Sequence, residues 1–257
     1  MPETTPRPPL LAALAAALAF ALPAPAAAFD PGAMTEDERA AFRAEVRAYL
    51  LENPEVLLEA IGVLEERQVA AQAVDDSALI AANAAAIFDN PASWVGGNPD
   101  GDVTVVEFVD YNCGFCKRAF PEVMDLVESD GNLRLILKEL PILGPDSELV
   151  SRFAIAVLQT EGPEAYAEAH EMLMMLPGRA GMPAVMRVGE ELGLDMDRIA
   201  ARMQGPEVSE VIDANRLLAQ RLGVNGTPTF ILEDRMVRGY LPREAMAEQV
   251  AEVRATP

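Results

Sequence analysis

The sequence has few cysteines, histidines and lysines, and each shortage argues against a class of function. Its 257 residues include two cysteines and one histidine, too few for four Cys/His ligands, so a structural zinc site of that kind would need a second chain. The lysines are Lys117 and Lys138, and Lys+Arg 20 against Asp+Glu 41 gives a net charge of -21. This charge repels phosphate groups and argues against nucleic acid and anionic lipid as partners. Hydrophobic residues make up 51% of the chain, enough for one large globular domain or two modest ones.

The first part of the chain has the pattern of a secretory signal peptide. Behind a head that carries Arg7, an apolar run extends from Leu10 to Leu22, which is shorter than the about 20 residues of a membrane-spanning helix. Small residues follow at positions 26–28 and predict cleavage before Phe29. We therefore expect residues 1–28 to be a cleaved signal peptide and the mature protein to be exported to a Gram-negative periplasm.

Residues 29–75 are predicted to form an N-terminal helical segment. Thr35 and Glu38 have the spacing of a capping box, and Pro54 suits the first position of a second helix. Apolar residues recur on one face of both helices. A two-helix unit of about forty residues buries little core alone, so it docks on the rest of the chain or associates with its own copies. We favour a homo-oligomer, and we expect a helical linker over residues 76–98.

Residues 99–257 are predicted to form an α/β domain. Dense turn residues at 96–102 precede a β-rich run at 103–109, and a helix from Cys113 to about Glu128 leads to a strand at 133–138. This strand-helix-strand unit predicts parallel strands with a right-handed crossover.

The second half of this domain is predicted to hold a helical insertion and a closing strand pair. The insertion covers about residues 145–222, with breaks at glycine and proline pairs. Strands are expected at 229–232 and 236–239, joined by a polar turn at 233–235, and an amphipathic helix at 242–253 closes the chain.

The two cysteines form the motif Cys113-Gly114-Phe115-Cys116 between a predicted strand and a predicted helix. There the helix amides and dipole favour a thiolate at Cys113, lowering its pKa from about 8.5 into the range of about 3.5 to 7.5. Cys116, one turn inside the helix, is expected to be less accessible, so the pair supplies one attacking and one resolving sulfur. A static disulfide is the weaker interpretation, because so short a loop constrains the unfolded chain very little.

Three segments together resemble the DsbA-like branch of the thioredoxin superfamily. They are Val106–Lys117 around the cysteines, Lys138–Gly144, and Gly223–Phe230 with its Thr-Pro before a strand pair. The resemblance runs from about Asp102 to Val253 and implies a thioredoxin fold with an inserted helical domain, preceded here by the helical segment. That segment, from Thr35 to Gln72, resembles the N-terminal oligomerisation segment of ScsC-like proteins, the periplasmic members linked to copper tolerance.

The resemblance implies roles for three further residues. Thr227-Pro228 is expected to be a cis peptide facing the cysteines, where the Thr227 backbone pairs with an extended substrate segment. Glu107 matches a buried acid that assists proton transfer to or from Cys116, and burial is expected to raise its pKa. Without the resemblance, a solvent-facing strand carboxylate is the favoured interpretation of Glu107.

The dipeptide between the cysteines bears on the direction of the reaction. Gly114-Phe115 lacks the histidine of strongly oxidising DsbA proteins and is closer to the dipeptide of periplasmic disulfide isomerases. The resemblance therefore implies a protein disulfide isomerase or reductase, without cofactor or metal, acting on unfolded or misfolded exported proteins. Shuffling needs a reduced Cys113, so the expected redox partner is a membrane reductase.

Two alternatives stay open. One is a DsbA-type dithiol oxidase served by a membrane oxidase. The other is a copper-tolerance protein that binds Cu(I) through the thiolates of Cys113 and Cys116, which are soft ligands. His170 and its neighbours Met172, Met174 and Met175 are also a conceivable Cu(I) ligand set, but methionine at helical spacing is ordinarily core filler, and we interpret these residues as packing.

Overall fold

The computed structural model describes residues 31–255. The chain divides into two compact units, Met1–Val63 and Leu64–Pro257. The predicted signal peptide, residues 1–28, lies outside the described residues. Within residues 31–255 no helix has both the length and the apolar character needed to cross a bilayer.

The first N-terminal helix begins at its predicted capping box, and the second begins one residue after Pro54, its predicted first residue. A 3-10 helix η1 (Pro31–Ala33) is followed by α1 (Glu36–Glu52) and by α2 (Glu55–Ala82), which continues into the second unit. Thr35 and Glu38 form the predicted capping box: the Glu38 amide donates to the Thr35 hydroxyl at 3.3 Å, and the Thr35 amide donates to the Glu38 carboxylate at 2.8 Å. None of the residues of α1, all of them described, is buried. Exposed apolar side chains on these helices include Val46, Tyr49, Leu51, Leu57, Leu58 and Ile61.

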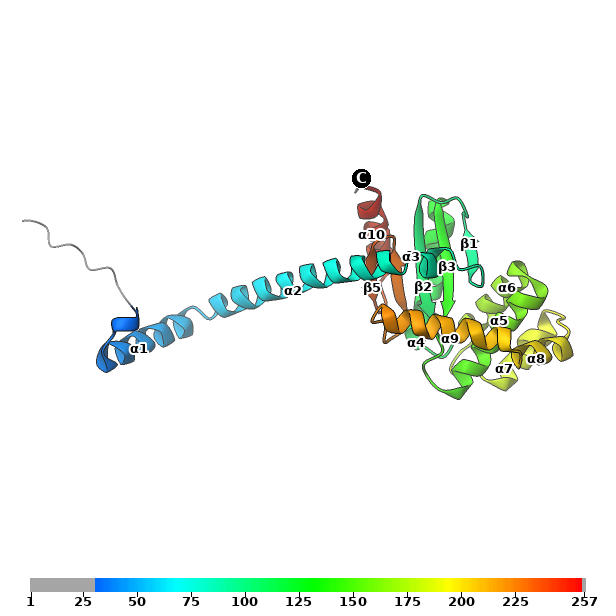
Figure 1. Ribbon diagram of the computed structural model, residues 1–257, viewed down its shortest axis with the longest axis horizontal. Coiled ribbons are helices and arrows are strands. Elements are labelled where there is room, and N and C mark those ends of the chain that lie inside the picture. Colours follow the sequence, from blue (N-terminus) through cyan, green and yellow to red (C-terminus); the bar gives the residue numbers. More distant parts are fainter. Residues whose placement is uncertain (1–30, 256–257) are drawn as a thin grey trace, which may run out of the picture. The chain divides into compact units, whose positions relative to one another are not determined.

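The second unit is built on a five-stranded sheet in the order β1-β3-β2-β4-β5 (Figure 1). β2 (Val103–Val109) and β3 (Leu133–Glu139) are parallel, as the strand-helix-strand pattern predicts. β4 (Thr229–Leu232) pairs antiparallel with β2, and β5 (Arg235–Arg238) pairs antiparallel with β4. The polar turn between these last two strands is Glu233-Asp234, so β5 begins one residue before the predicted start of its strand.

The first strand corrects the sequence prediction. We assigned Gly96 and Gly97 to a turn, whereas they belong to β1 (Trp94–Gly97), which pairs antiparallel with β3. Two glycines in a four-residue strand hide the apolar alternation that normally marks a strand. The segment is held instead by its ladder to β3 and by the Trp94 indole, which donates to the Pro163 carbonyl at 2.9 Å.

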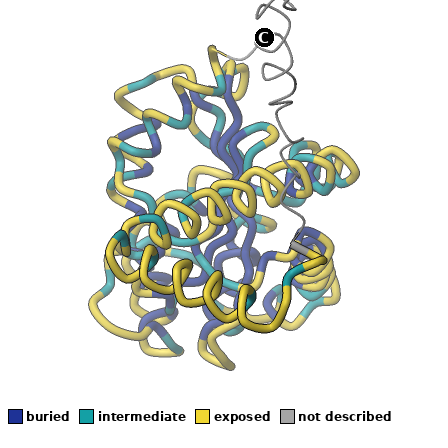
Figure 2. The backbone as a smooth tube through the Cα atoms, turned by 90° about the vertical axis from the view of Figure 1, so that its left-hand side faces the viewer, coloured by how far each residue is buried: buried dark blue, intermediate teal, exposed yellow. Residues whose placement is uncertain are grey.

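Helices cover both faces of the sheet. Alternate residues of its central strands point to opposite faces, and apolar residues on both faces are buried. Val105 and Leu135 belong to the core that includes α4 (Gly114–Asp130) and α10 (Arg243–Ala255). Val106 and Ile136 belong to a second core with α3 (Ala84–Phe88), the end of α2 and the end of α9 (Pro206–Arg221). Figure 2 shows the strands buried beneath helices whose outer sides are exposed.

The helical insertion lies between β3 and β4 and breaks where glycine and proline predict. Gly162-Pro163 separates the first two helices, and Gly205-Pro206 begins the last one. Its members are α5 (Pro145–Glu161), α6 (Pro163–Met175), α7 (Met182–Glu191), α8 (Met196–Met203) and α9.

A bidentate ion pair fixes the C-terminal part of α2 to the sheet edge. Both Arg238 guanidinium nitrogens lie 2.7 Å from the Asp76 carboxylate, and the Asp76 side chain is 4% exposed. Arg238 on β5 is directly opposite Thr229, the residue after the Thr-Pro motif. The pair therefore connects α2 to the strand next to that motif.

Replacing Asp76 with asparagine is expected to lower the free energy of unfolding by about 2 kcal/mol at pH 7, because a half-buried guanidinium loses its carboxylate. Hydrogen bonds from Arg238 lower the pKa of Asp76 below 3.8. The stabilisation is therefore present above pH 3.8 and is lost as pH falls through the folded-state pKa. Urea unfolding should show a difference in the free energy of unfolding between the wild type and the Asp76→Asn variant at pH 7, and this difference should narrow toward pH 3. The matched control is Asp75→Asn, since Asp75 is the exposed neighbour of Asp76. An equal loss from both substitutions would contradict the assignment.

Candidate active site

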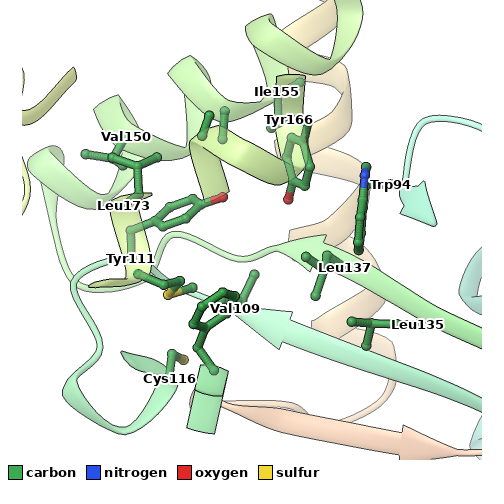
Figure 3. Packing of buried hydrophobic residues seen from close by; sticks show 14 of the residues in the cluster. Trp94, Val109, Tyr111, Cys116, Leu135, Leu137, Val150, Ile155, Tyr166 and Leu173 are labelled. Atoms are coloured by element: carbon green, nitrogen blue, oxygen red, sulfur yellow. The ribbon is translucent and has the colours of Figure 1, made fainter. Parts of the chain in front are cut away.

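The Cys-x-x-Cys motif occupies the junction between β2 and α4. Cys113 is the N-cap residue of α4, and its amide donates to the Asp110 carbonyl at 3.0 Å. Gly114 and Phe115 are exposed, Phe115 at 60%, whereas Cys113 is 6% and Cys116 0% exposed. Both cysteines are free thiols. Both cysteines are buried, and Cys113 keeps the larger exposed fraction, in the expected direction, while Cys116 packs fully in the main core (Figure 3).

The loop before β4 faces the first cysteine. The Thr227-Pro228 peptide is cis, as the resemblance implied. The Cys113 thiol donates to the Thr227 carbonyl at 3.0 Å. The loop is fixed on both sides, since the Thr229 hydroxyl donates to the Gly226 carbonyl at 2.8 Å and the Gly239 amide donates to the Pro228 carbonyl at 2.9 Å. The structure thus brings Cys113, Thr227 and Pro228 together.

The two thiols have opposite acidities. Hydrogen bonds from the Cys116 side chain and from the amides of Cys116 and Phe115 lower the pKa of Cys113 to about 5, against the effect of burial. Burial raises the pKa of Cys116 well above its usual range, and the hydrogen bond to Cys113 and the charge of Glu107 act in the same direction. At neutral pH the less buried sulfur, that of Cys113, is therefore a thiolate, and the fully buried sulfur of Cys116 is a thiol.

Glu107 is a buried acid whose charge interacts with both cysteines. It lies on β2 with 4% exposure, so the solvent-facing interpretation is wrong and the burial implied by the resemblance is confirmed. Burial, with the charges of Cys113 and Glu139 adding to it, raises the pKa of Glu107 to about 8. Its carboxyl is neutral near pH 7 while Cys113 is a thiolate, and its proton affinity depends on the Cys113 charge.

A second buried acid, Glu139, lies at the end of β3 and was not predicted as a site residue. Its carboxylate accepts hydrogen bonds from Tyr166 at 2.6 Å, from Tyr111 at 2.9 Å and from Ser151 at 2.9 Å. Burial raises its pKa to about 7 against the effect of these three donors. The Tyr111 hydroxyl also lies 2.9 Å from Nδ1 of His170, and Figure 3 shows Tyr111 and Tyr166 within the core. The network therefore connects Tyr111, two residues before Cys113, to helices α5 and α6 of the insertion.

His170 and its neighbouring methionines do not form one ligand set. His170 is buried among the rings of Tyr111, Phe120 and Tyr166, and burial lowers its pKa to about 3. Met174 is 2% exposed and Met175 63% exposed, so the two side chains lie in different environments. The interpretation as packing residues is confirmed for His170 and Met174 and is wrong for Met175, whose side chain is exposed. No group of three or more His, Cys, Asp or Glu side chains among the described residues could hold a metal ion.

Two polar residues that flank the Cys-x-x-Cys motif fix the loop between α6 and α7. The Asn112 side chain pairs with the Ala180 backbone, accepting from its amide at 2.6 Å and donating to its carbonyl at 3.0 Å. The Lys117 ammonium donates to the carbonyls of Leu176 at 2.8 Å and Gly178 at 2.6 Å. The insertion therefore forms one wall beside the cysteines.

A thioredoxin-like sheet with a helical insertion and with this cysteine pair opposite a cis-proline is the architecture of thiol-disulfide oxidoreductases of the DsbA and ScsC type. Residues 104–251 match the DSBA-like thioredoxin domain, and the chain belongs to this family. Residues 38–71 match the copper resistance protein ScsC N-terminal domain. Both parts of the predicted resemblance are therefore confirmed.

Solved structures agree with this assignment. The chain is 42% identical to a thioredoxin-like oxidoreductase from Silicibacter pomeroyi DSS-3, with a TM-score of 0.63, over 67% of this chain and 98% of that one. It is 26% identical to Proteus mirabilis ScsC in a transitional conformation, with a TM-score of 0.64, over 89% and 100%. A periplasmic thioredoxin-like protein from Salmonella enterica serovar Typhimurium is 29% identical, with a TM-score of 0.59, over 67% and 95%.

The chain spans about a quarter of the length of the first curated relatives that it matches. It is 30% identical over 167 residues to Na(+)/H(+) antiporter NhaA 1 of Salinispora arenicola, a match that covers 63% of this chain and 25% of that protein. The transport named for that longer protein is not assigned to this chain.

Proposed function

We propose that this protein catalyses thiol-disulfide exchange on exported proteins, with Cys113 as the attacking cysteine and Cys116 as the resolving one. The difference between the two sulfurs is the observation that carries the proposal. Cys113 lies at the helix terminus with a pKa of about 5, and Cys116 is fully buried with a raised pKa. Thiol exchange needs one stable, accessible thiolate and one sulfur that reacts later.

The exchange follows from these positions. The Cys113 thiolate attacks one sulfur of a substrate disulfide and releases the other as a thiolate, which leaves a mixed disulfide. For isomerisation, another substrate thiolate attacks this mixed disulfide and regenerates Cys113. For reduction, the Cys116 thiolate attacks the Cys113 sulfur, the second substrate thiolate leaves, and the Cys113–Cys116 disulfide remains.

Glu107 supplies the proton acceptor for the reductive step in this proposal. The Cys113 charge contributes to the raised Glu107 pKa, and this charge disappears when the mixed disulfide forms. The proton affinity of Glu107 then falls, so its carboxyl can release its proton to solvent, and the resulting carboxylate takes the Cys116 proton when Cys116 must attack. Thr227 and Pro228 hold the substrate: the Thr227 carbonyl faces Cys113 and offers a backbone partner for an extended segment.

Isomerisation is the mode that we propose, in a periplasmic homo-oligomer exported by its signal peptide. The Gly114-Phe115 dipeptide lacks the histidine of strongly oxidising relatives, and the helices that match the ScsC domain expose their apolar side chains. The relative from Salmonella is described as periplasmic. A membrane reductase would keep Cys113 reduced.

Refolding of a scrambled multi-disulfide protein tests the function. The reduced mature chain should restore native activity to the scrambled protein, and its reduction potential against glutathione should be less oxidising than that of a DsbA-type oxidase. A strongly oxidising potential combined with no shuffling would support the dithiol oxidase instead.

Replacing the exposed residues Leu57 and Ile61 of α2 with glutamate is expected to separate the subunits and to reduce the isomerase activity. Leu57 and Ile61 lie one turn apart and are 49% and 51% exposed. Glutamate at both positions places like charges in an apolar contact, so we expect a monomer by light scattering and at least about tenfold less isomerase activity, as avidity between linked sites is lost. Ala70→Glu is a single-charge control, because Ala70 is exposed and lies on the opposite face of the same helix. Unchanged mass and shuffling in the double variant would remove the oligomer from the proposal.

Cu(I) binding is the second candidate, because residues 38–71 match a domain named for copper resistance. The two thiols are soft ligands in one motif, but the raised Cys116 pKa opposes the thiolate that a metal needs. Titration of the reduced protein with Cu(I) under a competing chelator decides this candidate, and no competition would reject it.

A further inference from the structure

A cavity of about 550 Å³ lies beside the motif, between the start of α4 and the loop that joins α6 to α7. Asn112 and Gly114, which flank Cys113 in sequence, line it. The remaining lining residues are Lys117, Arg118 and the segment from Met174 to Arg179. A substrate residue next to a cysteine that is bonded to Cys113 is therefore within reach of this cavity.

The charge of the cavity is opposite to that of the chain. The protein carries Lys+Arg 20 against Asp+Glu 41, yet Lys117, Arg118 and Arg179 line the cavity and no carboxylate does. Among the ion pairs of the described residues, none includes any of these three cations. Three uncompensated positive charges thus meet at one entrance to the cysteine pair.

Neutral groups hold two of these cations in place. The Arg179 guanidinium donates to the Leu143 carbonyl at 3.2 Å, and the Arg118 guanidinium lies 4.6 Å above the centre of the Tyr240 ring. The acid one turn beyond Arg118, Glu122, accepts hydrogen bonds from Tyr240 and from the Arg243 amide instead. The cations are therefore oriented while their charge stays available to a ligand.

The lysine completes this arrangement. Its ammonium donates to the carbonyls of Leu176 and Gly178, which fix the position of its charge without neutralising it. The start of α4 adds the positive end of a helix dipole on the same side, because Gly114 begins the helix. The exposed Met175 offers an adaptable apolar surface at the same place.

We propose that this cavity binds the carboxylate side chains of substrate residues that flank the reacting cysteine, so that the protein prefers disulfides in acidic segments. The inference rests on the proposed exchange at Cys113 and adds a specificity to it. Backbone pairing at Thr227 reads little sequence, whereas the cavity distinguishes side chains by charge.

Three peptides test the preference. Each carries one cysteine in a mixed disulfide with a small neutral thiol, flanked on both sides by glutamate, glutamine or lysine. The reduced full mature protein is mixed with each peptide, and release of the small thiol is followed in single turnover at low salt. The glutamate peptide should react about five times faster than the glutamine peptide and the lysine peptide more slowly than both, in line with exposed ion pairs. The preference should shrink at high salt.

A charge variant locates the preference. In Arg118→Gln with Arg179→Gln, the glutamate-to-glutamine rate ratio should fall toward one. Arg235→Gln is the control, because Arg235 begins β5 at the end away from Thr229 and also lies on the surface; its ratio should stay at the wild-type value. Equal rates for all three peptides, or a ratio that the double variant leaves intact, would overturn the charge preference alone. No thiol release from any peptide would overturn the exchange activity itself.

Discussion

Replacing Cys113 with serine is expected to lower disulfide exchange by more than about a thousandfold, because a serine hydroxyl is not ionised at neutral pH and cannot replace the thiolate. Cys116→Ser should behave differently. Its Cys113 thiolate still attacks, but no second sulfur resolves the mixed disulfide, so a covalent complex with substrate accumulates. The difference follows from the position of the two sulfurs, one beside the Thr227 carbonyl and the other fully buried.

Non-reducing gel electrophoresis with a disulfide-bonded substrate measures both outcomes. The Cys116→Ser protein should form a band at the summed mass that disappears with reductant, and the Cys113→Ser protein should form none. Thermal unfolding of each variant shows whether loss of activity is separate from loss of fold. A Cys113→Ser protein that still exchanges disulfides would reverse the assignment of the two cysteines.

The reactive pair and its surroundings could be predicted because their signals are local or belong to the family pattern. The helix after Cys113 could be predicted from residue types within one short segment. The cis conformation of Thr227-Pro228 was expected from the resemblance alone. The N-terminal helix starts at Thr35 because its capping box is complete within four residues. Glu107 needed the resemblance, since a glutamate on a strand is more often exposed than buried.

The Glu139 network could not be predicted, because its members are distant in sequence. Tyr111 precedes Glu139 by 28 residues and Tyr166 follows it by 27, so no spacing within one helix or strand connects them. One feature of the sequence could have pointed to Glu139: it is a charged residue at the end of an apolar strand, within the segment Lys138–Gly144 on which the resemblance rests. β1 was missed for a related reason: its glycines carry no side-chain pattern, and its ladder to β3 crosses about forty residues.

Replacing Glu107 with glutamine is expected to slow the resolving step by about a hundredfold while leaving the first attack nearly unchanged. During the first attack Cys113 is a thiolate and Glu107, with a pKa of about 8, is neutral, so a neutral amide of the same shape changes little. During resolution the wild-type carboxylate accepts the Cys116 proton, and an amide cannot. Rapid quenching of single turnovers at pH 7 separates the two steps, and the first step serves as the internal control for folding. Equal resolving rates would exclude Glu107 as the proton acceptor.

The same substitution is expected to change the pH dependence of stability. Burial raises the pKa of Glu107 from 4.5 to about 8, so the folded protein binds more protons than the unfolded chain between these values. The stability linked to the neutral carboxyl is fully present below pH 4.5 and is lost as pH rises through about 8. Glutamine does not titrate. Between pH 5 and pH 9 the free energy of unfolding of the variant should therefore rise relative to that of the wild type by a few kcal/mol, since one pKa unit is about 1.4 kcal/mol. Urea unfolding of the reduced proteins measures the difference. Because the Cys113 thiolate contributes to the raised pKa of Glu107, this rise in relative stability should be smaller in the oxidised proteins. A rise that does not depend on redox state would contradict an electrostatic interaction between Glu107 and Cys113.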